Sequence, residues 1–287
     1  MIENIVFSGG SIRGIAYIGV LKYLEEHAML ENITNFAGTS IGACMAFCVI
    51  MGYTAAELSD IFIGIDIDKF RDISSDSVIS FFDTFGLDSG NKIIKMLEVM
   101  LKNKKFACDI TFSELTEATG KKLTIVGTCL NNMRSEYFST ETSPDMEVLT
   151  AIRITFSIPV MYQPVKHNNK YYVDGAVTDN YPIDLFDNDN KKTMGFVLIS
   201  QSIYDCEIDN IENYLLSIVW TSFAHQLKAK IERFRDISIE IDSEIDSFDF
   251  NINKNQRFEL IETGYKACEK QILQKYAHLD HLLDPQD

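Results

Sequence analysis

The chain has 287 residues, of which 46% are hydrophobic and 24% charged, and its formal net charge is −16. This is the composition of an ordinary folded protein, long enough to bury a sizeable core without disulfide or metal staples. An acidic surface repels nucleic-acid phosphates and disfavours purely electrostatic docking on an anionic membrane, so we expect no nucleic-acid partner.

The sequence also lacks targeting and metal-binding patterns. No apolar stretch reaches the length of a transmembrane helix, residues 41–51 being the closest approach, so any membrane contact must be peripheral. The N-terminus lacks the basic region followed by an apolar region that a secretion signal would have. The six cysteines show no CxxC or Cys/His spacing. We therefore expect a cytoplasmic protein with reduced thiols that uses neither a metal nor a cofactor.

The first elements alternate between strands and helices. Ile5 to Phe7 is a short apolar run and predicts a buried strand. Residues 13–28 have helical spacing, residues 35–38 form a second strand, and residues 41–51 form a helix that is apolar all round and therefore buried. This order predicts an α/β fold with three layers, α/β/α, around a mainly parallel central sheet.

A glycine-rich turn, Gly9-Gly10-Ser11-Ile12-Arg13-Gly14, follows the first strand. Such a turn before a helix presents free backbone N–H groups to an anion. It lacks the second glycine of G-x-G-x-x-G and the Gly-Lys-Ser/Thr of a P-loop, which makes a nucleotide site the weaker interpretation. Beside a nucleophilic serine it predicts an oxyanion hole.

That serine is Ser40, the centre of the pentapeptide Gly38-Thr39-Ser40-Ile41-Gly42 between the second strand and the second helix. A sharp strand-to-helix turn lifts the hydroxyl out of the fold, and the flanking glycines remove colliding side chains. The N-terminus of the helix favours developing negative charge. The alternative is a serine that only caps its helix between two packing glycines.

The later elements complete one predicted domain over residues 1–287, with the motifs in about residues 3–200. Thr54 and Glu57 form a capping box that begins a helix, and residues 65–89 form an irregular excursion. We predict helices over 91–101, 144–157, 210–234 and 254–276, and strands over 123–129, 135–139, 171–173, 194–200 and 237–241. No repeat or Pro/Gly-rich linker divides the chain.

The third motif is Asp174-Gly175-Ala176, which follows the strand at 171–173. Asp174 therefore lies at a strand end, where open α/β sheets place their sites. An ordinary Asp-Gly turn is the alternative.

These three motifs, in this order, resemble the patatin-like phospholipase family. The segments 151–159 and 174–182 also look like family blocks, so the resemblance covers about the first two-thirds of the chain. It implies a dyad without a catalytic histidine, in which Ser40 is the nucleophile and Asp174 the general base. Gly10 and Ser11, with Gly9 and Arg13 beside them, would form the oxyanion region. Ser11 stands where the family usually has a third glycine.

The resemblance implies a lipid acyl hydrolase that cleaves fatty-acyl esters of phospholipids or lysophospholipids at a membrane or micelle surface. One alternative is an acyltransferase or transacylase that uses the same dyad, and another is a silent binding protein. A third is an α/β-hydrolase-type esterase that uses His225 or His278. That fold places its nucleophile after several strands, whereas only two predicted strands precede Ser40.

Two further features have competing interpretations. Arg153 could pair with a lipid phosphate or could form a structural ion pair with Asp145 or Glu147. The excursion at 65–89 could cover an acyl groove or could hold fixed core aromatics. Its apolar residues are Phe70, Val78, Ile79, Phe81, Phe82 and Phe85.

Overall fold

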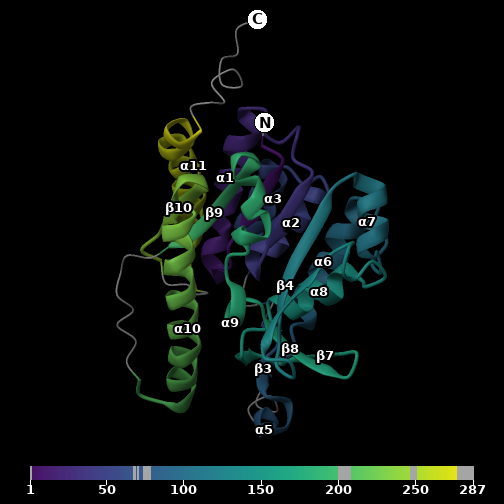
Figure 1. Ribbon diagram of the computed structural model, residues 1–287. Coiled ribbons are helices and arrows are strands. Elements are labelled where there is room, and N and C mark those ends of the chain that lie inside the picture. The colour runs from purple at the N-terminus through teal and green to yellow at the C-terminus, as the bar shows by residue number, and fades with distance from the viewer. Residues whose placement is uncertain are drawn as a thin grey trace, which may run out of the picture.

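A computed structural model of the chain describes residues 2–66, 69, 71–73, 79–199, 208–245 and 251–276. Helices flank a central sheet in these ranges (Figure 1). The strand order is β10-β9-β1-β2-β4-β8-β7, and β5 pairs with β4 outside this path. The strands are β1 (Asn4–Phe7), β2 (Asn35–Gly38), β4 (Lys122–Cys129), β5 (Arg134–Phe138), β7 (Val165–His167), β8 (Lys170–Asp174), β9 (Thr193–Ile199) and β10 (Ser238–Asp242).

The strands from β10 to β4 pair in parallel, whereas β5, β7 and β8 pair antiparallel with their neighbours. The predicted α/β fold with a mainly parallel sheet is thereby confirmed. Alternate residues of β1 point to opposite faces, as strand geometry requires. Ile5 and Phe7 belong to the large apolar cluster on one face, and Val6 belongs to a smaller cluster on the other.

The helices are α1 (Ala16–Glu26), α2 (Ile41–Ile50), α3 (Ala55–Gly64), α5 (Phe81–Thr84), α6 (Asn91–Asn103), α7 (Phe112–Thr119), α8 (Val148–Thr155), α9 (Ala176–Asp179), α10 (Ile211–Arg233) and α11 (Lys254–Lys275). The 3₁₀ helices include η1 (Ser11–Ile15), η3 (Ile183–Lys192) and η4 (Arg235–Ile237). The helix predicted over 13–28 is thus divided between η1 and α1. None of the described helices is long and apolar enough to cross a membrane.

Local sequence explains most of these boundaries. The predicted capping box at α3 is present, with Glu57 accepting from the Thr54 amide at 2.9 Å. Gly52 follows α2 with φ +83°, a conformation that glycine adopts without strain. The two long helices keep some apolar side chains exposed: Ile218 on α10 and Phe258 on α11 are each 54% exposed.

Helices α1 and α11 meet backbone to backbone. A Cβ atom on Gly19 would lie 1.8 Å from the Ile261 carbonyl oxygen, and one on Gly264 would lie 1.9 Å from the Ala16 carbonyl oxygen. The main apolar cluster joins residues of both helices, and β10 extends the same sheet. We propose on these contacts that the chain forms a single domain.

Strand pairing brings two strand ends together in the middle of β4. β2 runs parallel to the first half of β4 and ends with Gly38 opposite Ile125. β8 runs antiparallel to the second half and ends with Asp174 opposite Gly127. Residues that follow β2 and residues at the end of β8 therefore occupy the same region of the fold.

The described part of the excursion at 65–89 contains α5 and a short strand, β3 (Gly86–Asp88), which pairs in parallel with β6 (Val160–Tyr162). Phe82 is 83% exposed and Phe81 is half-buried. Helix α5 stands at one end of the molecule (Figure 1). Phe70 and Val78 lie outside the described residues.

Candidate active site

Ser40 occupies a sharp turn between β2 and α2. Its backbone has φ 53° and ψ −125°, which few residues with a side chain adopt. The turn is held by the Ser40 amide, which donates to the Thr155 hydroxyl at 2.9 Å, and by the Gly42 amide, which donates to the Thr39 carbonyl at 2.9 Å. Only 6% of Ser40 is exposed, so its hydroxyl lies in an enclosed site.

Both glycines of the pentapeptide are needed for close packing. A Cβ atom on Gly38 would lie 2.6 Å from the Ala43 nitrogen, and one on Gly42 would lie 2.5 Å from the Phe7 carbonyl oxygen. No larger residue fits at either position without moving backbone. The glycines thus allow α2 to start directly behind the serine.

Asp174 is 1% exposed at the end of β8. Its Oδ1 accepts from the Ala176 amide at 2.8 Å, whereas Oδ2 is buried and has no hydrogen-bond partner among the described residues. Burial raises the pKa of the Asp174 carboxyl to about 7, and the hydrogen bond from Ala176 offsets part of the rise. The carboxyl is therefore poised to change protonation near neutral pH.

The Ser40 hydroxyl lies beside this carboxyl, since its hydrogen-bonding contribution also lowers the pKa of Asp174. The contact is looser than an ordinary hydrogen bond, because Oδ2 remains without a partner. Both residues line one cavity. The structure thus brings the proposed nucleophile and base to the same cavity.

The glycine-rich turn supplies free backbone donors next to Ser40. Within the described ranges, the amides of Gly10 and Ser11 have no acceptor, and Ser11 has φ 51°. The Gly9 amide is already used, because it donates to the Asn180 carbonyl at 3.0 Å. Gly10 and Ser11 are accordingly the donors available for an oxyanion, and Gly9 contributes close packing.

Arg13 lies under the same turn and is 6% exposed. Its Nη1 donates to the Ile199 carbonyl at 3.1 Å, and its Nε is buried without a partner in the described structure. The side chain lines the cavity that holds Ser40 and Asp174. It therefore adds a positive charge to this side of the site.

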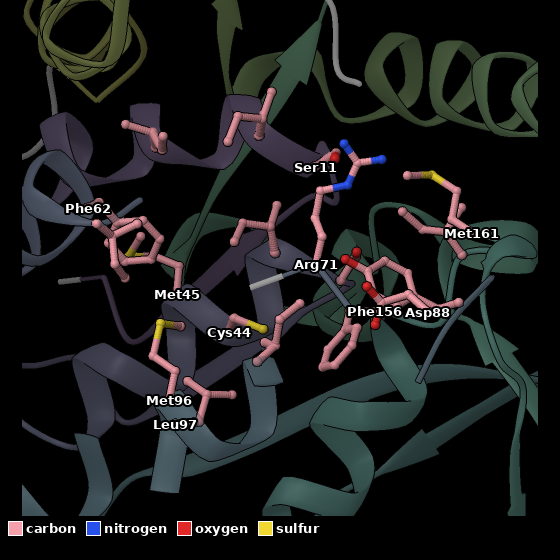
Figure 2. A pocket seen from close by; sticks show the side chains of 18 of the residues that line it. Ser11, Cys44, Met45, Phe62, Arg71, Asp88, Met96, Leu97, Phe156 and Met161 are labelled. Carbon is pink, nitrogen blue, oxygen red and sulfur yellow. The ribbon is translucent and has the colours of Figure 1, made fainter. Parts of the chain in front are cut away.

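Two cavities meet at Ser40. The first, here called the apolar cavity, has a volume of about 210 Å³. Figure 2 shows side chains from several elements that surround it. Its walls include Ile12, Met45, Phe62, Leu97 and Phe156.

The second, here called the α10 cavity, has a volume of about 600 Å³ and is lined by Asp174, Asn180, Arg13 and the α10 residues Trp220, Phe223 and Lys228, among others. Ser11, Ser40 and Ile158 line both cavities. The hydroxyl of Ser40 thus stands at the junction of an apolar chamber and a more polar one.

Arg153 lines neither cavity. Its guanidinium donates to the Ser89 carbonyl at 3.0 Å, to the Gln163 carbonyl at 2.9 Å and to the Ser157 hydroxyl. Its Cζ also lies 5.2 Å from the centre of the Phe156 ring. These contacts indicate a structural role for Arg153. Its partners are carbonyl and hydroxyl oxygens, whereas the sequence suggested the carboxylates of Asp145 or Glu147.

No histidine of the described chain lines either cavity. His225 is exposed on α10, and His278 lies outside the described residues. In the same ranges no three His, Cys, Asp or Glu side chains gather closely enough to hold a metal ion.

Sequence reasoning missed the polar network behind Asp174. Asp179 is 3% exposed and accepts from Lys230 Nζ at 2.6 Å and from the Tyr137 hydroxyl at 2.9 Å. Lys230 belongs to α10, so the network fixes that helix against the segment after Asp174. Asp179 and Asn180 lie inside the segment 174–182, and its resemblance to a family block was the sequence feature that could have pointed to them.

Comparison with known proteins agrees with this fold. The family model for patatin-like phospholipases matches residues 5–187. An uncharacterized protein of Acanthamoeba polyphaga mimivirus is 32% identical over 96% of each chain. A protein of Invertebrate iridescent virus 6, named a probable lipid hydrolase, is 33% identical over 74% of each chain.

Among solved structures, VipD from Legionella pneumophila superposes with a TM-score of 0.65 at 16% identity, over 96% of this chain and 67% of that one. At such low identity the likeness concerns the fold alone. The family assignment comes from the family model and the viral relatives. They show that this chain belongs to the patatin-like phospholipase family.

Proposed function

We propose that this protein is a serine lipid acyl hydrolase in which Ser40 is the nucleophile and Asp174 the general base. The observation that carries the proposal is the buried Asp174 carboxyl, whose unpartnered Oδ2 lies beside the strained turn of Ser40. A general base works best when its pKa is near the working pH, and burial raises the pKa of Asp174 to about 7.

The chemistry follows from these positions. Ser40 Oγ attacks the ester carbonyl carbon while its proton passes to Asp174 Oδ2. The carbonyl oxygen becomes negative and accepts from the Gly10 and Ser11 amides. The C–O bond to the alcohol breaks, and the alcohol leaves with the proton from Asp174. Water then attacks the acyl-enzyme carbonyl carbon and gives a proton to Asp174. When the bond to Ser40 Oγ breaks, this proton passes from Asp174 to Oγ and the fatty acid leaves, which restores both residues.

The two cavities support a lipid ester as substrate. The apolar cavity suits the acyl chain, and the α10 cavity suits the alcohol part. The name of the iridescent virus relative supports a lipid substrate, and the family description supports a phospholipid, with lysophospholipids as the related candidate. Exposed Ile79, Phe82 and Phe85 around α5 supply apolar contacts for a peripheral meeting with a membrane or micelle surface.

Labelling with a fluorophosphonate tests the nucleophile, and mass spectrometry of products from a mixed lipid panel tests the substrate class. Wild type should be labelled and should release fatty acid. Ser40→Ala and Asp174→Asn should do neither at a comparable rate, with folds intact by circular dichroism. Labelling that persists in Ser40→Ala would refute the assignment.

His225→Asn is the matched control. It should keep turnover within about tenfold, or roughly 1.4 kcal/mol of barrier. A loss of several orders of magnitude would favour a histidine-dependent esterase instead. Adding an alcohol acceptor to the same assay tests the transacylase alternative, because transfer gives a new ester in place of free acid.

A further inference from the structure

Three buried polar side-chain atoms lack hydrogen-bond partners in the described structure: Arg13 Nε, Asp174 Oδ2 and Asn180 Oδ1. All three belong to residues that line the α10 cavity. Buried polar groups are nearly always paired, so orphaned atoms gathered around one cavity indicate that a polar ligand completes them. The proposed reaction uses Asp174 Oδ2 but neither Arg13 Nε nor Asn180 Oδ1, and of these two atoms only Asn180 Oδ1 is an acceptor.

The Asn180 amide is fixed beside Ser40. Asn180 is 8% exposed, and its backbone carbonyl accepts a hydrogen bond from the Gly9 backbone amide at 3.0 Å. A Cβ atom on Gly9 would lie 2.4 Å from Asn180 Oδ1 and 3.4 Å from Ser40 Cβ. Asn180 Oδ1 therefore packs directly against Gly9, close to the Ser40 side chain, and any side chain at position 9 would collide with it.

The missing partner of this oxygen must be a donor. In the proposed reaction the Ser40 hydroxyl serves Asp174 Oδ2, so the donor for Asn180 comes from the bound substrate. The part of the substrate that lies on this side is the alcohol, because the apolar cavity on the other side suits the acyl chain. An alcohol with a free hydroxyl next to the ester offers an O–H donor, whereas a fully esterified glycerolipid offers none there.

We propose that Asn180 accepts a hydrogen bond from a free hydroxyl on the alcohol part of the substrate. The inference rests on the proposed function and narrows it. Asn180 makes the enzyme select glycerolipids that keep a hydroxyl beside the cleaved ester, such as lysophospholipids, over fully esterified ones. A polar site rejects analogues without the matching group because its own buried atom is then left unpaired.

A pair of substrates that differ only in this hydroxyl tests the proposal. Wild type should hydrolyse 1-acyl-lysophosphatidylcholine with a kcat/KM at least about tenfold above that of its 2-O-methyl ether. Asn180→Ala should lower the value for the hydroxyl substrate to that of the ether, and Asn180→Asp, which keeps an oxygen acceptor, should preserve the preference. His225→Asn, on α10 but outside both cavities, should leave the ratio unchanged.

A binding measurement separates this inference from the hydrolase proposal. In Ser40→Ala, calorimetry should show at least about tenfold tighter binding of a non-hydrolysable 1-O-alkyl lipid with a free hydroxyl than of its 2-O-methyl ether, both below their critical micelle concentrations. Equal affinities would overturn the inference and leave the hydrolase intact. If the protein discriminates between the two lipids but wild type cleaves no ester, the hydrolase proposal would be refuted and the hydroxyl-binding role of Asn180 would be retained. An equal slowing of both substrates in Asn180→Ala would assign Asn180 to the attacking water and also overturn the inference.

Discussion

The Thr155 hydroxyl accepts a hydrogen bond from the Ser40 amide at 2.9 Å, although the two residues are 115 positions apart. Thr155 ends α8 and is fully buried. The bond joins α8 to the turn that carries the proposed nucleophile. It also satisfies an amide that the start of α2 would otherwise leave unpaired. Thr155 is accordingly a positioning residue for Ser40.

Thr155→Val keeps the shape of this side chain but removes the acceptor. We expect a stability loss of about 1–3 kcal/mol from the buried, unpaired Ser40 amide, and a kcat about tenfold or more below wild type because the turn is less well fixed. Thr155→Ser should restore both values. Urea unfolding and steady-state kinetics measure them. A variant with normal kcat but reduced stability would limit Thr155 to a structural role.

The raised pKa of Asp174 predicts how activity depends on pH. Below about pH 7 the carboxyl is protonated and cannot accept the Ser40 proton, so kcat/KM should fall tenfold per pH unit well below that value. Above it, activity should reach a plateau. A pH profile on a neutral ester, with enzyme folding checked at each point, measures this. A profile that stays flat down to pH 5 would contradict the assignment of Asp174 as base.

The same shift predicts a stability effect of the opposite sign to that of a salt-bridged aspartate. In the unfolded chain Asp174 ionises near its ordinary value of 3.8, while in the folded protein it holds its proton up to about pH 7. The folded state therefore binds more protons between these values, and stability falls as pH rises through this interval. Asp174→Asn should be more stable than wild type at pH 8, by on the order of 4 kcal/mol at most, and should lose that advantage near pH 4.

Ser11→Gly should stabilise the protein without loss of activity. Ser11 has φ 51°, where a Cβ atom is disfavoured by about 1–2 kcal/mol, and glycine removes this penalty while keeping the amide donor. Ser11→Val, a β-branched residue, should lose both stability and activity. Thermal unfolding and labelling rates measure the two effects. Lower activity in Ser11→Gly would show that the hydroxyl itself takes part.

Arg153→Ala should destabilise the protein and slow all substrates alike. The change removes hydrogen bonds from Arg153 to Ser89, Ser157 and Gln163, and we expect a loss of about 3 kcal/mol. Arg153→Lys should recover little of it, because an ammonium cannot reach three acceptors in this planar arrangement. The ratio of KM values for a phospholipid and a neutral short-chain ester is the decisive measurement. A rise in KM for the phospholipid alone would make Arg153 a phosphate ligand.

Phe82→Ser should weaken activity on aggregated lipid only. Phe82 is 83% exposed, so its removal should change stability by no more than about 0.5 kcal/mol. Hydrolysis of a soluble monomeric ester should remain unchanged, while vesicle co-sedimentation and hydrolysis of micellar substrate should decrease. Leu273→Ser, on α11 at a distance from α5 in Figure 1, is the control. Equal effects of the two variants would argue against α5 as a lipid contact.

The local parts of the site could be predicted from sequence. The strand at 35–38, the turn at Ser40 and the buried helix that follows depend on an apolar run and its bordering glycines, which lie within a few residues of one another. Helix α7 was equally local and was overlooked, although Thr111 and Glu114 form a capping box there.

The parts that depend on contacts between distant segments could not be predicted. Nothing in residues 170–174 indicates that β8 runs antiparallel to β4, because strand direction follows from how the whole chain is connected. The partners of Arg153 are carbonyl groups, which every residue carries, so no sequence pattern marks them. Asn180 likewise gains its significance only from its position across Gly9 from Ser40.

The backbone contact of α1 with α11 also determines when α1 is covered during synthesis. β1 lies between β2 and β9, so its second neighbour exists only after residue 199 has been made. The surface of α1 around Gly19 is then covered only after Ile261 on α11 has been synthesised. Non-local pairings of this kind form late and leave apolar surface exposed to the translation machinery and to chaperones. Ser40 is thus translated early, but the α10 cavity beside it is complete only after Glu240 on β10 has been synthesised.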